Sequence, residues 1–180
     1  IGFPVVLKGS SPELTHKTEM GMVRVNLKNR DDVGGAFDEL SGKGIRLEGF
    51  LVQEMVEGRR EFVIGLTRDP QFGPSVMFGL GGIFAEVMKD VCFRIGPITR
   101  SEAMAMIRSI KAFPILDGAR GRPKADVEAL ADALVRLAAL AVDLQDSIAE
   151  IDINPLIVLP AGQGVVAVDA LFKPRSAATH

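Results

Sequence analysis

Three side chains with oxygen atoms, near the end of the chain, could together bind a metal ion. Asp152 and Asn154 alternate with apolar residues in a stretch expected to be a strand, and Asp169 ends the next one. Side-chain alternation puts Asp152 and Asn154 on one face, and antiparallel pairing could bring Asp169 alongside Asn154. Hard cations such as Mg²⁺ prefer oxygen ligands of this kind. A solvated sheet face with Asn154-Pro155 starting a turn explains the same pattern, so both interpretations stay open.

Two further features could contact an anion. Lys8 ends an apolar strand and either extends to the surface or points into a cleft toward a negative group. Taken alone, Lys8 favours the surface interpretation. The glycines of Gly79–Gly82 would let main-chain N–H groups approach phosphate oxygens. Their spacing is neither that of a P-loop nor that of a dinucleotide fingerprint, so an ordinary turn is the simpler interpretation.

The remaining reactive side chains are few. His16 lies in a polar loop and could accept a phosphoryl group or act as an acid or base, although most loop histidines are merely solvated. His180 belongs to the end of the chain. Cys92 lies between Val91 and Phe93 and is expected to pack as a small apolar residue.

The elements that must position these residues are mixed helices and strands. Asn29, Thr99 and Asp126 are candidate helix caps, for helices over 30–42, 100–111 and from 127 to about 144. The stretches 47–56 and 61–67 are expected to form a hairpin around Glu57-Gly58-Arg59-Arg60. The other expected strands are 4–9, 21–27, 75–78, 151–159 and 165–170. The predicted class is therefore α+β, in two lobes.

Composition excludes several classes of protein. The 180 residues carry a net charge of −2, so no basic surface predicts binding to nucleic acid or to an anionic membrane. No apolar run approaches the roughly 20 residues of a membrane-spanning helix. One cysteine excludes an internal disulfide framework and favours a reducing compartment such as the cytoplasm. Because the first residues already read as a strand, we expect the sequence to be a segment of a longer polypeptide.

Seven stretches, taken in order, resemble the ATP-grasp domain of NDP-forming acyl-CoA synthetases, the group that contains the ADP-forming acetyl-CoA synthetases. The resemblance covers nearly the whole chain, from Gly2 to Phe172. Any one stretch alone is weak evidence for the family, whereas the seven stretches in this order are strong evidence. The stretches are Gly2–Lys8, Ser11–Lys17, Val52–Gly58, Asp69–Pro74, Met77–Glu86, Gly118–Gly121 and Glu150–Pro155.

The resemblance implies an ATP-grasp fold with ATP or ADP and Mg²⁺ held between two lobes. The expected division is a small lobe over 1–50, incomplete at its N-terminus, a large lobe over 51–172 and a tail over 173–180. By analogy with the family, Lys8 contacts nucleotide phosphate, and Gly81 and Gly82 belong to a phosphate loop. Gln53, Glu54 and Met55 form the hinge that meets adenine, with Glu57 near the ribose. Asn154 and Asp169 hold Mg²⁺, and His16 relays the phosphoryl group.

The reaction implied by the resemblance joins an acid to CoA while ATP becomes ADP and phosphate, through an acyl phosphate and a phosphohistidine. CoA-binding and CoA-ligase domains or subunits would be the partners, and the full enzyme would be an oligomer. One alternative is a succinyl-CoA synthetase β-like subunit, which shares the Asn-Pro and final Asp pattern. Another is a non-catalytic domain that senses nucleotide in a larger protein. The presence of Lys8, His16, Asn154 and Asp169 together favours catalysis.

Overall fold

The computed structural model describes residues 1–11, 20–58, 60–82 and 88–175, with two compact units, Ile1–Glu57 and Gly58–His180. The boundary therefore follows Glu57, whereas the sequence analysis placed it after residue 50. The reason is strand pairing, because residues 49–54 pair with the first strand of the chain. No helix in the described part of the chain is long and apolar enough to cross a membrane.

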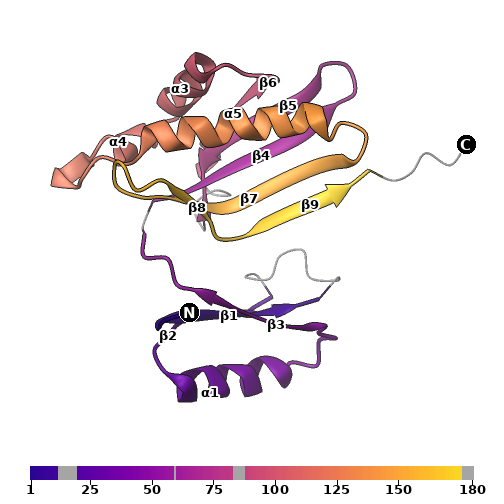
Figure 1. The fold of residues 1–180 in the computed structure, drawn as a ribbon, viewed down its shortest axis with the longest axis vertical. Coiled ribbons are helices and arrows are strands. Elements are labelled where there is room, and N and C mark those ends of the chain that lie inside the picture. The colour runs from indigo at the N-terminus through magenta and orange to yellow at the C-terminus, as the bar shows by residue number, and fades with distance from the viewer. Residues whose placement is uncertain (12–19, 59, 83–87, 176–180) are drawn as a thin grey trace, which may run out of the picture. The chain divides into compact units, whose positions relative to one another are not determined.

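The first unit is a three-stranded antiparallel sheet with one helix (Figure 1). The strand order is β2-β1-β3. As expected, the Asn29 side chain caps the helix by accepting a hydrogen bond from the Asp32 N–H at 2.8 Å. The elements are β1 (Val5–Ser10), β2 (Val23–Leu27), α1 (Arg30–Ser41) and β3 (Gly49–Glu54).

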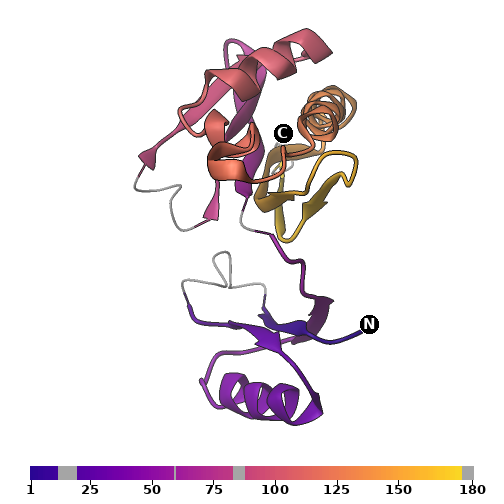
Figure 2. The ribbon, with the colours of Figure 1, turned by 90° about the vertical axis from the view of Figure 1, so that its left-hand side faces the viewer.

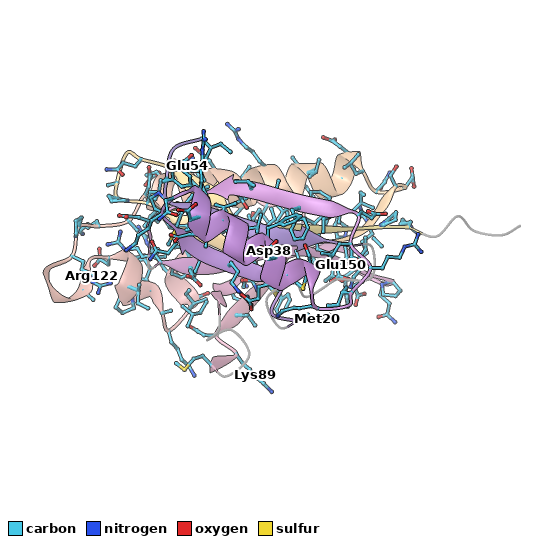
Figure 3. All side chains as sticks on the ribbon, turned by 90° about the horizontal axis from the view of Figure 1, so that it is seen from below. Met20, Asp38, Glu54, Lys89, Arg122 and Glu150 are labelled. Carbon is cyan, nitrogen blue, oxygen red and sulfur yellow. The ribbon has the colours of Figure 1, made fainter. Side chains whose placement is uncertain are left out.

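Alternation along β1 divides this sheet into two faces. Val5 and Leu7 point toward α1 and share a buried cluster with Met22 and Leu40. Figure 3 views the unit from the side of α1, with Asp38 on the helix and Glu54 at the end of β3. Since successive side chains of a strand alternate, Lys8 belongs to the face turned away from the helix.

The second unit is built on an antiparallel six-stranded sheet. Its strands follow the order β6-β5-β4-β7-β8, and β9 also pairs with β7. The strands are β4 (Glu61–Asp69), β5 (Gly73–Leu80), β6 (Val91–Ile95), β7 (Ile148–Val158), β8 (Val165–Ala167) and β9 (Ala170–Pro174).

Helices cover one face of this sheet, as Figures 1 and 2 show for α3 and α5. Side chains such as Phe62, Phe78, Met106, Leu134 and Ile151 form the buried core between the two layers. Burial of this apolar surface is the main favourable contribution to folding of the unit. The helices are α3 (Arg100–Ser109), α4 (Phe113–Leu116), the 3₁₀ turn η2 (Ala119–Gly121) and α5 (Val127–Asp143).

The α+β class and the three caps are confirmed, with a complete capping box between Thr99 and Glu102. The hairpin expected around residues 57–60 is wrong, because β3 and β4 belong to different sheets. The expected tail also begins later, since Pro174 of β9 still pairs with Ile148 of β7.

Candidate functional site

Lys8 is buried in the first unit. It lies on the central strand β1, opposite Leu51 of β3 and Val23 of β2, and only 5% of its surface is exposed. The interpretation in which Lys8 extends to the surface is therefore wrong. An ammonium group at this depth is costly unless negative or polar groups compensate it, so its environment must suit a cation.

The expected adenine hinge is the edge strand β3 and the residues after it. Gln53 lies opposite Val6 and shares the Lys8 face of the sheet. The Met55 N–H donates to the Pro4 carbonyl at 3.3 Å, so that group is already used within the unit. Because the direction of main-chain groups alternates along an antiparallel strand, the N–H and C=O of Glu54 point away from β1. Glu57 is exposed.

In the second unit, Gly81 and Gly82 directly follow the end of β5 and form what we call the glycine turn. The Gly81 N–H donates to the Glu61 carbonyl at 2.9 Å, and the Gly82 N–H donates to Oδ1 of Asn154 at 3.2 Å. A Cβ on Gly81 would lie 2.5 Å from the carbonyl group of Phe62. Gly82 has a φ of +64°, and a Cβ there would overlap the Glu61 carboxylate. Gly81 therefore requires glycine, because a Cβ there would meet main-chain atoms, whereas at Gly82 the positive φ strains other residues and the Glu61 side chain could move aside.

Asn154 is aimed at this turn by a bulge in β7. Phe62 and Ile64 of β4 pair with Leu156 and Ile153 of β7, so two residues of β7, Asn154 and Pro155, oppose one residue of β4. A bulge redirects side chains from their regular alternation. The Asn154 amide consequently reaches the main chain of Gly82, which follows β5.

Asn154 and Asp169 are direct neighbours, as the sequence analysis predicted. The main-chain N–H of Asn154 donates to the main-chain carbonyl of Asp169 at 3.2 Å. Oδ1 of Asp169 accepts the N–H of Ala170 at 3.0 Å. Asp152, two residues before Asn154, lies opposite Gly65 of β4 and Leu171 of β9.

The donor chemistry of this pair fits a hard cation. An amide oxygen and a carboxylate on adjacent segments can bind Mg²⁺, which keeps several waters and phosphate oxygens as further ligands. Among the described residues there is no cluster of three or more His, Cys, Asp or Glu side chains that could hold a metal by itself. The pair therefore suits an ion brought by a phosphate ligand better than a fully protein-bound ion.

Two other expected residues have different outcomes. His16 lies outside the described residues. Cys92 packs against the core of the second unit, with its Sγ 3.5 Å from the Met106 carbonyl, as expected of a small apolar residue. Burial raises the pKa of the Cys92 thiol, which keeps it protonated at neutral pH and argues against a role as a nucleophile.

Glu61 and Asp90 also touch the glycine turn or its base, and neither was predicted from the sequence. Glu61 contacts the turn through its main chain and its carboxylate. The Asp90 carbonyl accepts the Leu80 N–H at 3.0 Å. Both contacts join residues distant along the chain, and a charged residue beside an apolar strand was the only local signal.

Known proteins resemble the chain over almost all of its length. The family described as ATP-grasp domain matches residues 1–173. The β subunit of acetate–CoA ligase (ADP-forming) I from Pyrococcus furiosus is 47% identical over 176 residues, which are 94% of this chain and 75% of that subunit. Acetate–CoA ligase (ADP-forming) I from Archaeoglobus fulgidus is also 47% identical, over 92% of this chain and 25% of that ligase.

Solved structures agree with these relatives. The dinucleotide-forming acetyl-coenzyme A synthetase 1 of Ca. Korarchaeum cryptofilum, in complex with coenzyme A, Ca-AMPCP and HgCl⁺, superposes with a TM-score of 0.90 at 45% identity. The match covers 97% of this chain and 78% of that one. A second structure of that synthetase holds coenzyme A and Mg-AMPPCP, with its phosphohistidine segment pointing towards the nucleotide-binding site; its TM-score is 0.85 at 44% identity, over the same shares of the two chains.

The chain thus spans about three quarters of the Pyrococcus subunit and a quarter of the Archaeoglobus ligase. With a family match over residues 1–173 and a fold shared with the Korarchaeum synthetase, the chain belongs to the ATP-grasp domain family, in the group that contains the ADP-forming acetate–CoA ligases.

Proposed function

We propose that this chain is the ATP-binding, phosphoryl-transferring module of an ADP-forming acid–CoA ligase. The observation that carries the proposal is the junction at Asn154, whose main-chain N–H donates to the Asp169 carbonyl and whose side-chain oxygen accepts the Gly82 N–H. Gly81, where only glycine fits, stands directly before Gly82. This junction lies in a chain 47% identical to a ligase subunit of which it covers 75%. The overall reaction converts an acid, CoA and ATP into acyl-CoA, ADP and phosphate.

In this proposal the first unit binds the nucleotide through a cation and a strand edge. Lys8 neutralises phosphate charge, which agrees with its burial on the face shared with Gln53. The main-chain groups of Glu54, which point away from β1, are the best placed of the hinge to meet adenine. The Met55 N–H is committed to Pro4, so we assign Met55 a packing role beside the base. The exposed Glu57 carboxylate is assigned to the ribose hydroxyls.

In the second unit, Asn154 and Asp169 would hold Mg²⁺. Gly81 and Gly82 are assigned to the phosphates because the missing side chains let an anion come close, while their own N–H groups donate to Glu61 and Asn154. A bound Mg²⁺ supplies positive charge that stabilises the transferring phosphoryl group. Asn154 can serve both the turn and an ion, because its Oδ1 has two lone pairs and the Gly82 N–H uses one.

The phosphoryl group then moves by way of histidine. The bond between the γ-phosphorus and the ADP oxygen breaks, a phosphorus–nitrogen bond to a histidine forms, and ADP leaves. His16 is assigned as a relay to the principal phosphohistidine of the CoA-ligase partner. The Korarchaeum complex whose phosphohistidine segment points towards the nucleotide-binding site supports this use of a histidine. The acid takes the phosphoryl group as an acyl phosphate, from which the CoA thiol displaces phosphate.

The module therefore needs CoA-binding and CoA-ligase domains, in the same polypeptide or in another subunit of an oligomer. The Pyrococcus relative is named as one subunit of a larger enzyme, which supports this requirement. The single cysteine agrees with action in the cytoplasm.

Calorimetric titration with Mg-AMPPCP tests the proposal. We expect the full chain to bind the nucleotide in a Mg²⁺-dependent manner. Asn154→Ala and Asp169→Ala should each weaken binding by about 10-fold or more, the value of a charge-assisted contact. Asp146→Ala, which removes an exposed carboxylate from the same unit, is the matched control and should bind like the wild type. Absence of binding by the wild type, or equal affinity in all variants, would contradict it.

A further inference from the structure

Asp90 is a buried carboxylate that the proposed function leaves without a role. It lies just before β6 and is 7% exposed. One carboxylate oxygen accepts the main-chain N–H of Lys111 at 2.8 Å, and the other accepts that of Ala112 at 2.7 Å. These donors lie between α3 and α4, so the side chain of Asp90 ties the sheet to the helical layer.

The main chain of Asp90 holds the base of the glycine turn. Its carbonyl accepts the N–H of Leu80, the residue directly before Gly81, at 3.0 Å. Gly79 approaches so closely that a Cβ there would lie 2.5 Å from the same carbonyl oxygen. A close main-chain contact of this kind transmits any displacement of Asp90 to the end of β5, because packed interiors have little free space.

The far side of the turn is held by different residues. Gly81 donates to Glu61, and Gly82 donates to Asn154. The turn is thus fixed between β4 and β7 on one side and Asp90 on the other. Two N–H groups of the helical layer hold the Asp90 carboxylate. They therefore fix the position of Asp90 and of the end of β5 that contacts its carbonyl.

We propose that Asp90 is a positioning residue for phosphoryl transfer, acting through Leu80 on the Gly81–Gly82 turn and on Asn154. This inference rests on the proposed function, in which the turn and Asn154 serve the nucleotide phosphates. Loss of one N–H acceptor at Asp90 should shift the turn by a fraction of an ångström. Small displacements of positioned groups lower the rate of the chemical step more than they lower binding.

The chain contains a matched control, Asp126. It is 9% exposed, and its carboxylate accepts two main-chain N–H groups, from Ala129 at 3.1 Å and Gly164 at 2.8 Å. Like Asp90, it joins a helix start to another segment of the second unit. Its hydrogen-bond partners in the described part of the chain lie outside the glycine turn; they include Ala129, Leu130, Leu159 and Gly164. Asp90→Asn and Asp126→Asn therefore remove comparable hydrogen bonds and differ in what they position.

The test measures melting temperature, Mg-ATP affinity and the kcat of ATP-driven phosphoryl transfer, in the chain assembled with its CoA-binding and CoA-ligase domains. Both variants should melt below the wild type. Asp90→Asn should lower kcat by about 10- to 100-fold, with a smaller change in KM for ATP. Asp126→Asn should keep the wild-type kcat. Ala112→Pro is a second variant, for use if Asp90→Asn does not fold. It removes one of the two N–H donors to Asp90 at a φ of −75°, which proline can adopt, and should lower kcat in the same way.

The outcomes separate the two proposals. Equal kcat in Asp90→Asn and Asp126→Asn, or a wild-type kcat in Ala112→Pro, would overturn the positioning role and leave the proposed function intact. A wild type that does not bind Mg-ATP would overturn the proposed function and this inference together.

Discussion

The main-chain N–H of Asn154 is hydrogen-bonded to the main-chain carbonyl of Asp169, with 3.2 Å between the two atoms. The same asparagine accepts the Gly82 N–H on its side-chain oxygen, also at 3.2 Å. One residue therefore connects β7, the segment before β9 and the turn after β5. The proposed metal pair and the proposed phosphate turn are held in a single network, so disturbing one is expected to disturb the other.

Replacement of Lys8 by Met should weaken Mg-ATP binding by about 10- to 100-fold, because a charge-assisted contact to phosphate is lost. The fold should survive, since Met has a similar length and no charge to bury. Titration with Mg-AMPPCP and a melting curve check both statements. Lys28→Met removes an exposed lysine of the same unit and should leave both unchanged. If Lys8→Met lowers the melting temperature while affinity stays at the wild-type value, Lys8 has a structural role only.

Local signals predicted much of the secondary structure. The helix starts at Asn29, Thr99 and Asp126 could be predicted because a cap is decided by residues within one turn of each other. The strand that contains Asp152 and Asn154 could be predicted from its alternating polar and apolar residues. Its contact with the segment of Asp169 could be predicted because only a short connection separates the two.

Features that depend on contacts between distant residues could not be predicted from the sequence. Two adjacent apolar stretches, β3 and β4, look like a hairpin, but β3 pairs with β1, far back along the chain. The bulge at Asn154 depends on the register of β4, which the sequence of β7 does not contain. Likewise, the contacts of Asp90 with Lys111 and Ala112 become visible only when the helices are in place.

Gly81→Ala should destabilise the second unit by about 1–3 kcal/mol, because its Cβ would meet the main chain of Phe62, which cannot move as a side-chain end can. Mg-ATP affinity should fall as the turn is displaced. Gly121→Ala is the control: its φ of +75° makes alanine strained, yet nothing lies within 4 Å of the added Cβ. Gly121→Ala should lower the free energy of unfolding by about 1–2 kcal/mol and leave the affinity for Mg-ATP unchanged. Urea unfolding and titration compare the two, and equal affinities would remove the turn from the nucleotide site.

Acid should weaken the second unit partly through Asp126. The N–H groups of Ala129 and then Gly164 hold the pKa of its carboxyl below the ordinary value. A lowered folded-state pKa stabilises the fold fully above the unfolded pKa of about 3.9, and this stability is lost as pH falls through the folded value. Asp126→Asn should therefore flatten the decline of unfolding free energy below about pH 5. Urea titrations across this range measure it, with Asp146→Asn as control. An unchanged pH slope in Asp126→Asn would show that other carboxylates dominate.

His16→Ala should greatly slow phosphoryl exchange between ATP and the histidine of the CoA-ligase partner, while Mg-ATP affinity changes little. The reason is that a covalent relay contributes to the transfer and not to binding. Isotope exchange in the assembled enzyme measures the first quantity and calorimetry the second. Wild-type exchange rates in the variant would mean that ATP phosphorylates the partner histidine directly.

The most direct test of the central claim is transfer of label from γ-³²P-ATP to protein histidine. With the chain, Mg²⁺ and the CoA-ligase partner present, we expect acid-labile, base-stable phosphate on the protein, discharged when acid and CoA are added. Omission of the chain, or Asp169→Ala within it, should abolish the label. Labelling that is equal with and without the chain, or unaffected by Asp169→Ala, would contradict the claim that this chain carries the ATP-dependent phosphoryl transfer.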